Sequence, residues 1–459
     1  MVVPKSDIFE GTMEQLSNKL LLKNTSIITM ESNTVLSNHD VEIEKGLIKD
    51  IKPTGVIPVG PYCEVIDCSE KFTIPGLMDM HVHLEHEEEM LLYLANGVTS
   101  VRNMWGGKNH IYWRQMIKNE KLFCPYIYTT SPLIDGAPVF WPNSVVFENP
   151  EEVKEAISEY KRVGYQQLKI YNGLTKEIYD AICEAGNEHQ MPLVGHVPYA
   201  LALDYVLDKG QYCLEHFDGF TLKLIPQEYL KKWKPGDTAS TLEILKHIDE
   251  TAIPVVIDKV IRAGAWVCPT LVVWILLDLE SERKFLERPE NEYLLPSLLS
   301  EWSWMTESAR QDPAWGKYLS IEKVLSKVYA SHLKEAGGKM IVGTDTPNPH
   351  VIPGFSIHDE LETLVETGYT PFEVLEGCTK NGAEFMSDLD TVGTVSIGKR
   401  ADLLLLNENP LVNISNTRNR YGIVWRRKWF PQEVLDKQLE DLKQSMAKKR
   451  EETEKQQER

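Results

Sequence analysis

Cysteine is scarce and scattered in this sequence. The 459 residues include 7 cysteines, an odd number, and no two of them form a CxxC pair. This pattern argues against a disulfide framework and favours a reducing compartment. We therefore expect a cytoplasmic protein, with a secretory signal that was removed as the open alternative.

Long apolar runs and an excess of positive charge are also missing. The apolar run at 271–277 is too short to span a bilayer, and no signal-peptide pattern opens the chain. The 49 Lys and Arg residues face 68 Asp and Glu residues, which gives a formal net charge of −19. Because phosphate contacts need clustered cations, we expect neither a nucleic acid nor a membrane as a partner.

The composition is otherwise that of a globular protein. Hydrophobic residues make up 42% of the chain and charged residues 25%, so a large core is available and wholesale disorder is excluded. Short strand-like runs separated by turn residues fill 19–72 and return at 402–406 and 423–425. The two flanks predict one composite β-sandwich domain built from both termini, at 18–73 and 391–434.

Between these flanks, strand and helix signals alternate. Eight strand-like stretches lie at 77–83, 98–103, 126–130, 167–171, 193–197, 212–216, 266–269 and 340–345. This order predicts an α/β fold with a closed parallel (β/α)8 TIM barrel over 74–390. The charged tail at 435–459 is expected to be helical or disordered.

Two segments exceed the length that a βα unit needs. They lie at 226–251 and 278–334, and the second carries Trp302, Trp304 and Trp315. Insertions that follow barrel strands lie over the catalytic face, so both segments are candidate lids. The alternative is a peripheral or oligomer-forming element, and we expect a homo-oligomer.

The strongest local signal is the pair His81 and His83 in the first barrel strand. Side chains alternate along a strand, so both imidazoles point to the barrel lumen and can share one metal ion. An HxH pair also occurs by chance, so it carries weight only with other ligands.

Later strands supply such residues at or near their carboxyl ends, where barrel active sites are built. Lys169 is a cation inside an apolar strand, which is costly unless the group is paired or chemically changed. His196, His216 and Asp345 each end a strand-like stretch. A satisfied core histidine explains any one of the histidines, but not the set.

The order of these residues along the chain resembles that of the metal-dependent amidohydrolase superfamily: HxH, then Lys, His, His and Asp. Two sequence segments, IPGLMDMHVH at 74–83 and GTVSIGKRADL at 393–403, also resemble motifs of this superfamily. The resemblance runs from about residue 19 to about residue 434. It points to the branch of imidazolonepropionase-related amidohydrolases and prolidase-like carboxypeptidases that release a C-terminal proline, arginine or lysine.

The resemblance implies two divalent metal ions. Lys169 would be carboxylated by CO2, and the resulting carbamate would bridge the ions. One ion would be held by His81, His83 and Asp345, and the other by His196 and His216. Zinc suits histidine-rich ligands, with other divalent ions as alternatives.

The same resemblance suggests a mechanism. The metals would lower the pKa of a shared water and give a bridging hydroxide. Asp345 would act as general base and then as general acid. Tyr171 lies two residues beyond Lys169, so it faces the same lumen and can contact substrate, or else packs on the barrel rim.

Two further residues are weaker candidates for substrate contact. Trp141 lies in a segment, 137–142, where several relatives have Gly-His-Gly, and it suggests an aromatic wall; an ordered Pro-rich loop is the alternative. His358 begins a predicted helix after the Asp345 loop and could lie near the site or on the surface.

Together these features predict a binuclear metal-dependent hydrolase acting on a small molecule. The leading hypothesis is cleavage of an amide bond in a dipeptide or N-acyl amino acid. The alternatives are a lactone or phosphotriester hydrolase, a deaminase, or a non-catalytic protein on the same scaffold. Lys169 argues against the mononuclear deaminases, which lack a bridging lysine.

Overall fold

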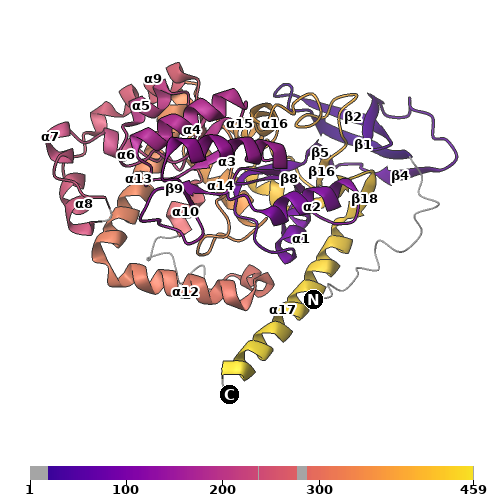
Figure 1. The fold of residues 1–459 in the computed structure, drawn as a ribbon. Helices are drawn as coiled ribbons and strands as arrows, with labels where there is room; N and C mark the ends of the chain where they lie inside the picture. The colour runs from indigo at the N-terminus through magenta and orange to yellow at the C-terminus, as the bar shows by residue number, and fades with distance from the viewer. Residues whose placement is uncertain (1–18, 236, 277–286, 458–459) are drawn as a thin grey trace.

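The computed structural model describes residues 19–235, 237–276 and 287–457. Figure 1 shows a barrel of strands and helices beside a separate β-sheet, with one long C-terminal helix projecting from the body. No helix in the described ranges combines the length and the apolar character needed to cross a bilayer.

The separate sheet is built from both ends of the chain, as predicted. Its strands are β1 (Lys19–Ile28), β2 (Val35–Glu44), β3 (Leu47–Pro53), β4 (Cys63–Asp67), β5 (Phe72–Pro75), β16 (Leu403–Leu406), β17 (Arg420–Trp425) and β18 (Lys428–Pro431). The order is β18-β17-β16-β5-β1-β2-β3, and β4 pairs with β1. The two ends of the chain join where β16 pairs antiparallel with β5.

Strand β16 shows how this sheet attaches to the barrel. Its four leucines are all buried, because alternate side chains face two different cores. Leu403 and Leu405 pack in a small cluster within the sheet domain. Leu404 and Leu406 pack in the large core that the barrel shares. The sheet therefore covers one side of the barrel rather than standing apart from it.

Eight parallel strands form the barrel within the described residues. They are β6 (Leu77–Val82), β7 (Val98–Asn103), β8 (Tyr126–Thr129), β11 (Leu168–Ile170), β12 (Leu193–Gly195), β13 (Cys213–Glu215), β14 (Trp266–Cys268) and β15 (Lys339–Met340). Strands β6 to β8 pair in one group and β11 to β15 in another. The short strands β9 (Ile134–Asp135) and β10 (Val145–Val146) lie in the connection after β8 and extend the second group beside β11.

Backbone hydrogen bonds join the two groups into a ring. On one side, the Gln166 amide donates to the Thr129 carbonyl (3.0 Å) and the Ser131 amide to the Gln167 carbonyl (2.8 Å). On the other side, the Met80 amide donates to the Val342 carbonyl (2.9 Å). The predicted (β/α)8 barrel is confirmed, and its strands meet around a common lumen.

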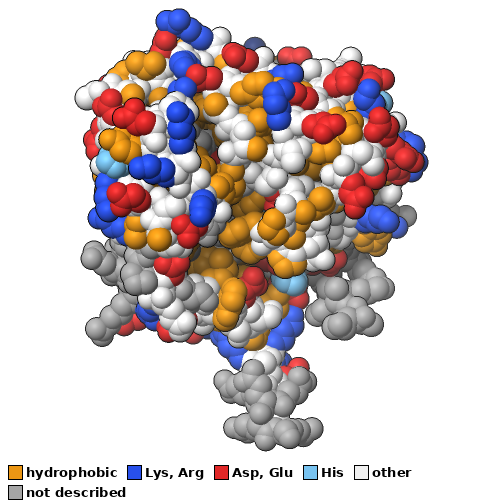
Figure 2. Space-filling view, turned by 60° about the vertical axis from the view of Figure 1, so that its left-hand side comes forward, with side chains coloured by type: hydrophobic (Ala, Val, Ile, Leu, Met, Phe, Trp, Pro, Cys, Tyr) orange, Lys and Arg blue, Asp and Glu red, His pale blue; other side chains and the backbone are white. Residues whose placement is uncertain are grey.

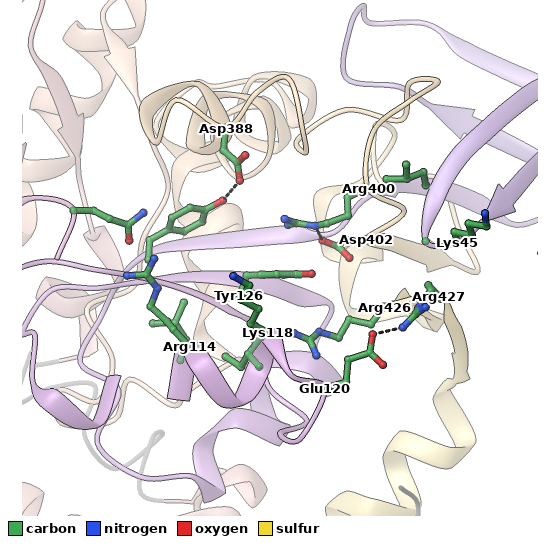
Figure 3. Close-up of a pocket in the computed structure, with 16 residues that line it drawn as sticks. Lys45, Arg114, Lys118, Glu120, Tyr126, Asp388, Arg400, Asp402, Arg426 and Arg427 are labelled. Carbon is green, nitrogen blue, oxygen red and sulfur yellow. Dashed lines mark hydrogen bonds and ion pairs between the residues drawn. The ribbon is translucent and has the colours of Figure 1, made fainter. Parts of the chain in front are cut away.

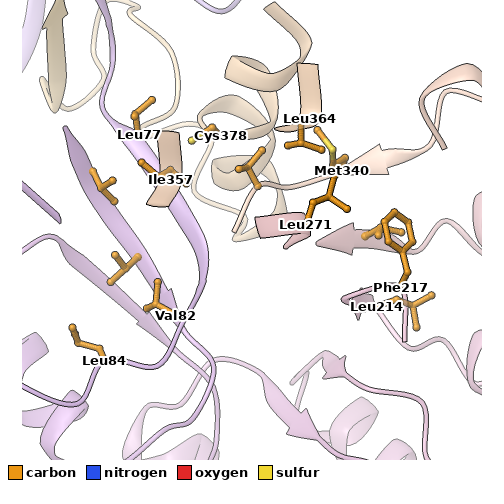
Figure 4. Close-up of a cluster of buried hydrophobic side chains, with 14 of the residues drawn as sticks. Leu77, Val82, Leu84, Leu214, Phe217, Leu271, Met340, Ile357, Leu364 and Cys378 are labelled. Carbon is orange, nitrogen blue, oxygen red and sulfur yellow. The ribbon is translucent and has the colours of Figure 1, made fainter. Parts of the chain in front are cut away.

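An outer ring of helices surrounds these strands: α1 (Glu88–Ala95), α2 (Lys108–Lys118), α3 (Pro150–Val163), α4 (Lys176–Glu188), α5 (Leu203–Asp208), α9 (Ile253–Ala263), α14 (Ser356–Glu366), α15 (Pro371–Gly377) and α16 (Lys380–Phe385). Helix α3 illustrates the local signals. The Asn149 side chain accepts from the Glu152 amide, Pro150 opens the helix, and Gly164 ends it in the left-handed region. Leu77 and Val82 of β6 and Ile357 of α14 belong to the large core, and Figure 4 shows Leu77 beside Ile357.

The insertions are helical. The first contains α7 (Gln227–Leu230), α8 (Thr238–Leu245) and η1 (Glu250–Ala252), after the short α6 (Phe220–Lys223). The second follows α10 (Leu271–Leu276) and contains η2 (Pro289–Tyr293), α12 (Pro296–Gln311) and α13 (Pro313–Glu335); its first residues, 278–286, lie outside the described part of the chain.

The charged tail forms helix α17 (Gln432–Gln457), and Leu435 and Met446 are buried where it packs on the body. Lys449 also pairs with Glu88 of α1, at 2.7 Å. The exact domain boundaries stay a prediction.

Candidate metal centre

Three predicted ligands come together at the carboxyl ends of the barrel strands. His81 lies in β6, His216 directly follows β13, and Asp345 lies beyond β15. One nitrogen or oxygen atom from each of these side chains lies within 4.8 Å of the other two. His81 Nε2 is 3.2 Å from Asp345 Oδ1, and His83 Nε2 is 2.8 Å from the same oxygen. This spacing lets one small cation contact several of these atoms at once.

The other three predicted ligands, His83, Lys169 and His196, lie in the same place. Lys169 and His196 line one cavity together with His83, His216 and Asp345. The ring centroids of His196 and His216 are 5.0 Å apart, and those of His81 and His216 are 4.6 Å apart. All six candidate ligands therefore meet at one end of the barrel; their role as ligands stays a prediction at this point.

A polar side chain holds the Nδ1 atom of three of these imidazoles. The pairs are His81 with Glu215 Oε2 (2.8 Å), His196 with Asn172 Oδ1 (2.8 Å) and His216 with Thr270 Oγ1 (2.6 Å). This arrangement fixes each ring and leaves Nε2 for the shared space, as is usual for histidines that bind metal. His81 Nε2 is buried and has no hydrogen-bond partner, so a bound cation would satisfy it.

Burial sets the charge state of the cluster. It lowers the pKa of His81 and His196 well below the usual range, and that of His216 to about 4. Burial alone would raise the pKa of Asp345, but the neighbouring His81 and His216 hold it below its usual range. The cluster thus offers neutral imidazoles and an ionised carboxylate, which are the forms that bind a divalent metal.

Lys169 is almost fully enclosed, with 1% of its surface exposed. Burial lowers the pKa of its ammonium group, although the nearby carboxylates of Glu215 and Asp345 oppose that shift. A lysine in this position is easier to deprotonate than one in water.

Sequence reasoning missed a buried ion pair behind His81. Arg102 Nη2 lies 3.0 Å from both carboxylate oxygens of Glu215, and neither side chain is exposed. Arg102 Nε also donates to the Met80 carbonyl in β6. A signal existed, because Arg102 is a cation within a buried strand, as Lys169 is.

A second buried carboxylate ties the Asp345 loop to the first strand. Asp79 in β6 accepts hydrogen bonds from the Thr344 amide (3.0 Å) and hydroxyl (2.6 Å). Burial raises the pKa of Asp79 to about 7. These contacts place Asp345 opposite His81 and His83.

The cavity above the cluster has a volume of about 480 Å³ and an aromatic lining. Its aromatic side chains include Trp105, Phe140, Trp141, Trp302 and Trp315. The last two come from α12 and α13, so the second insertion forms part of the cavity wall; its role as a lid stays a prediction. Figure 2 shows hydrophobic side chains in a hollow on one face, between scattered acidic and basic groups. Among the described residues that line the cavity, Lys169 is the only lysine or arginine.

The structure brings two of the three predicted substrate contacts into this cavity. Trp141 Nε1 donates to the Tyr171 hydroxyl oxygen at 2.9 Å, and the Tyr171 ring lies 4.3 Å from the His196 ring. Burial raises the pKa of Tyr171 above its usual range, so the phenol keeps its proton.

His358 is placed elsewhere, and a substrate-contact role for it is not supported. It is not among the residues that line the cavity. Its Nδ1 lies 2.9 Å from the Thr417 hydroxyl, in η3 (Ile414–Arg418). The phase of α14 turns this buried side chain toward the C-terminal segment of the chain rather than toward the barrel lumen.

Comparisons with known proteins agree with this fold. A solved bottromycin amidohydrolase is 23% identical, with a TM-score of 0.77 over 97% of this chain and 94% of that one. A solved Xaa-Pro dipeptidase is 20% identical, with a TM-score of 0.66 over 90% of this chain and 100% of that one. Both likenesses concern the fold.

Matches to curated sequences are short. An imidazolonepropionase of Psychromonas ingrahamii is 36% identical over 69 residues, which are 14% of this chain and 17% of that protein. This chain spans less than a third of the length of each curated relative that it matches. Residues 72–429, well over half of the chain, match the Amidohydrolase family. The protein therefore belongs to the Amidohydrolase family, a family of metal-dependent hydrolases, as its motifs predicted.

Proposed function

We propose that this protein is a binuclear metal-dependent hydrolase that cleaves an amide bond in a small substrate. The observation that carries the proposal is the buried cluster of His81, His216 and Asp345, with a mutual spacing of at most 4.8 Å between ligand atoms. His83, His196 and Lys169 complete the set around the same cavity.

The residues present suit two divalent ions, preferably zinc. His81, His83 and Asp345 would hold one ion, and His196 and His216 the other. When bound, such ions lower the pKa of a water molecule and polarise a substrate carbonyl. The polar partners Glu215, Asn172 and Thr270 would hold the imidazoles in the orientation that binding needs.

Lys169 would bridge the two ions as a carbamate. Formation of a carbamate needs the neutral amine, and burial favours that form because it lowers the pKa of this lysine. The reaction replaces a buried cation with an anion, which removes the cost of an enclosed positive charge beside two metal ions.

Two side chains have further roles in the proposed reaction. Asp345, held ionised by its histidine neighbours, would accept a proton from the attacking water and pass it to the leaving amine. The Tyr171 oxygen accepts the Trp141 N–H, which leaves its own proton free. Tyr171 would therefore donate to the carbonyl oxygen of the substrate as negative charge develops there.

The lining of the cavity indicates the kind of substrate. Five tryptophans and one phenylalanine contribute rings to it, which favours an apolar or aromatic group beside the scissile amide. Lys169 is the only cation that the described lining offers, and it is committed to the metals. Among dipeptides and N-acyl amino acids, we therefore expect those with large apolar side chains to be cleaved best.

A hydrolysis screen tests the proposal. Metal-loaded protein is assayed with dipeptides, N-acyl amino acids, lactones, phosphotriesters and aminated purines. Turnover of amides supports the proposal. Turnover confined to lactones or phosphotriesters, or release of ammonia from the purines, contradicts the amide assignment.

The carbamate is tested separately with Lys169→Ala, beside the exposed Lys154→Ala as a matched control. We expect Lys169→Ala to lose activity and to regain part of it with small carboxylic acids, while Lys154→Ala keeps full activity. Full activity in Lys169→Ala would contradict the bridging role. A homo-oligomeric state and a cytoplasmic location stay predictions; sedimentation of the purified protein and localisation of a tagged chain would test them.

A further inference from the structure

A second cavity, of about 550 Å³, lies at the side of the barrel that meets the sheet domain. It is bounded by the start of β8, the end of α2, the β2–β3 turn and the β17–β18 turn (Figure 3). The metal cluster is built at the carboxyl ends of the barrel strands, whereas this cavity borders Tyr126, the first residue of β8. The two cavities share no lining residue.

The lining of this cavity is positively charged, although the chain as a whole carries −19. Six basic residues and three acidic residues contribute, which leaves three positive charges in excess: Lys45, Arg114, Lys118, Arg400, Arg426 and Arg427 against Glu120, Asp388 and Asp402. The cavity therefore has the opposite sign to the rest of the surface and would attract anions.

The acidic residues are already engaged. Asp402 pairs with Arg400 at 2.5 Å, Glu120 pairs with Arg427, and Asp388 accepts the Tyr128 hydroxyl at 2.6 Å. Within the described residues, no carboxylate lies in ion-pair range of Lys45, Lys118 or Arg426. Lys45 and Lys118 therefore have no partner carboxylate in the described lining, whereas the charge of Arg426 is offset in part by the nearby Asp402.

Three guanidinium nitrogens in this lining are buried and have no hydrogen-bond partner. They are Arg400 Nη2 and Arg426 Nε and Nη1. Buried donors in native proteins are nearly always satisfied by protein, water or a ligand, and buried charged donors most of all. Two arginines with unsatisfied donors in one cavity suit the binding of a multivalent anion, because each guanidinium group can donate several charge-assisted hydrogen bonds.

Aromatic rings hold both guanidinium groups in place. The guanidinium carbon of Arg400 lies 3.7 Å from the centroid of the Tyr126 ring. That of Arg426 lies 4.7 Å from the Trp425 ring and 5.5 Å from the Tyr126 ring. Stacking on the rings orients the two guanidinium groups and does not use their N–H donors. Less side-chain conformational freedom is therefore lost when an anion binds.

We propose that this cavity is a binding site for a small phosphorylated molecule, with the phosphate held by Arg400 and Arg426 and with Lys45 and Lys118 at its rim. A phosphoryl group presents several acceptor oxygens and more than one negative charge, which matches three unsatisfied donors and a three-charge excess. The volume exceeds what a single phosphate needs and lies in the range of small-molecule sites. The site is independent of the metal cluster and of the proposed hydrolysis.

Calorimetric titration of the metal-loaded protein with pyrophosphate tests this proposal, with citrate and inorganic phosphate as parallel probes. The variants are Arg426→Gln and Lys118→Gln, and the exposed Arg162→Gln is the matched control. Lys118 is exposed, so its change should not affect folding, and circular dichroism checks Arg426→Gln. Because pyrophosphate could also bind the metals, only the difference between the wild type and these variants counts.

We expect wild type and Arg162→Gln to bind pyrophosphate equally, and more tightly than citrate. Arg426→Gln should bind about 10-fold more weakly or worse, since it loses charge-assisted hydrogen bonds. Lys118→Gln should bind more weakly by a smaller factor that shrinks at high salt. Hydrolytic activity should be the same in all four proteins. Equal affinities in wild type and Arg426→Gln, or tighter binding of citrate than of pyrophosphate, would overturn the proposal.

Discussion

The buried ion pair behind His81 allows a quantitative test of how the metal cluster is supported. The perturbation is Glu215→Gln, which keeps the shape of the side chain and removes its charge. Arg102 Nη2, now 3.0 Å from both carboxylate oxygens, would then be an enclosed cation without a counter-ion. Removing one partner of such a pair costs about 3–5 kcal/mol of unfolding free energy.

The same substitution should also weaken metal binding. Glu215 Oε2 lies 2.8 Å from His81 Nδ1 and fixes the ring that presents Nε2 to the cavity. Loss of a partner of this kind typically weakens metal binding by about 10- to 100-fold. We therefore expect Glu215→Gln to lower both the stability of the metal-free protein and its affinity for zinc.

Two assays separate these effects. Urea denaturation of metal-free protein measures stability, and competition with a chromogenic chelator measures zinc affinity. In the double variant Arg102→Met/Glu215→Leu, both charges are gone, so stability should return toward that of the wild type while zinc affinity stays low. The exposed Glu159→Gln, which breaks a surface pair with Arg162, is the control and should change neither quantity. If Glu215→Gln behaves as Glu159→Gln does, the proposed support of His81 is refuted.

Three further predictions follow from the cavity and its surroundings. Trp302→Ala should raise KM for apolar substrates and cost about 3–5 kcal/mol of stability, whereas Trp304→Ala, on the solvent side of the same helix, should leave both unchanged; equal effects would contradict the lid role. Asp345→Asn should lower kcat by about 10²- to 10⁴-fold in steady-state assays, and a kcat near that of the wild type would contradict its role as base. Burial raises the pKa of Glu322 from 4.5 to about 7, so the folded state favours the protonated acid and loses stability as pH rises through this interval. Gln cannot ionise, so the difference in unfolding free energy between Glu322→Gln and the wild type should rise in favour of the variant by up to about 3 kcal/mol as pH increases from 4.5 to 7. Denaturation curves that give the same difference at both pH values would contradict this.

The barrel, and the meeting of the candidate ligands at one of its ends, could be predicted from sequence for a geometric reason. Parallel strands of a barrel all end at one face, so residues far apart in sequence, such as His81 and Asp345, meet once each is known to end a strand. Alternation along a strand then decides which side chains face the lumen, and it placed His83 and Tyr171 in the cavity.

Other parts of the site needed the structure. Arg102 and Glu215 are 113 residues apart, and no periodic pattern links two single charges in different strands. The position of His358 was left open, because the phase of a helix relative to the barrel depends on tertiary packing. For the same reason, sequence could not tell that α12 turns Trp302 into the cavity and leaves Trp304 70% exposed.

The central claim is that one end of the barrel holds two divalent metal ions. Its most direct test is the metal content of purified, folded protein after equilibration with zinc and removal of the excess. The account predicts close to two ions per chain in the wild type and fewer in His216→Asn, with unchanged content in the control His86→Asn, whose side chain is 43% exposed. A wild-type content near zero, or the same content in all three proteins, would contradict it.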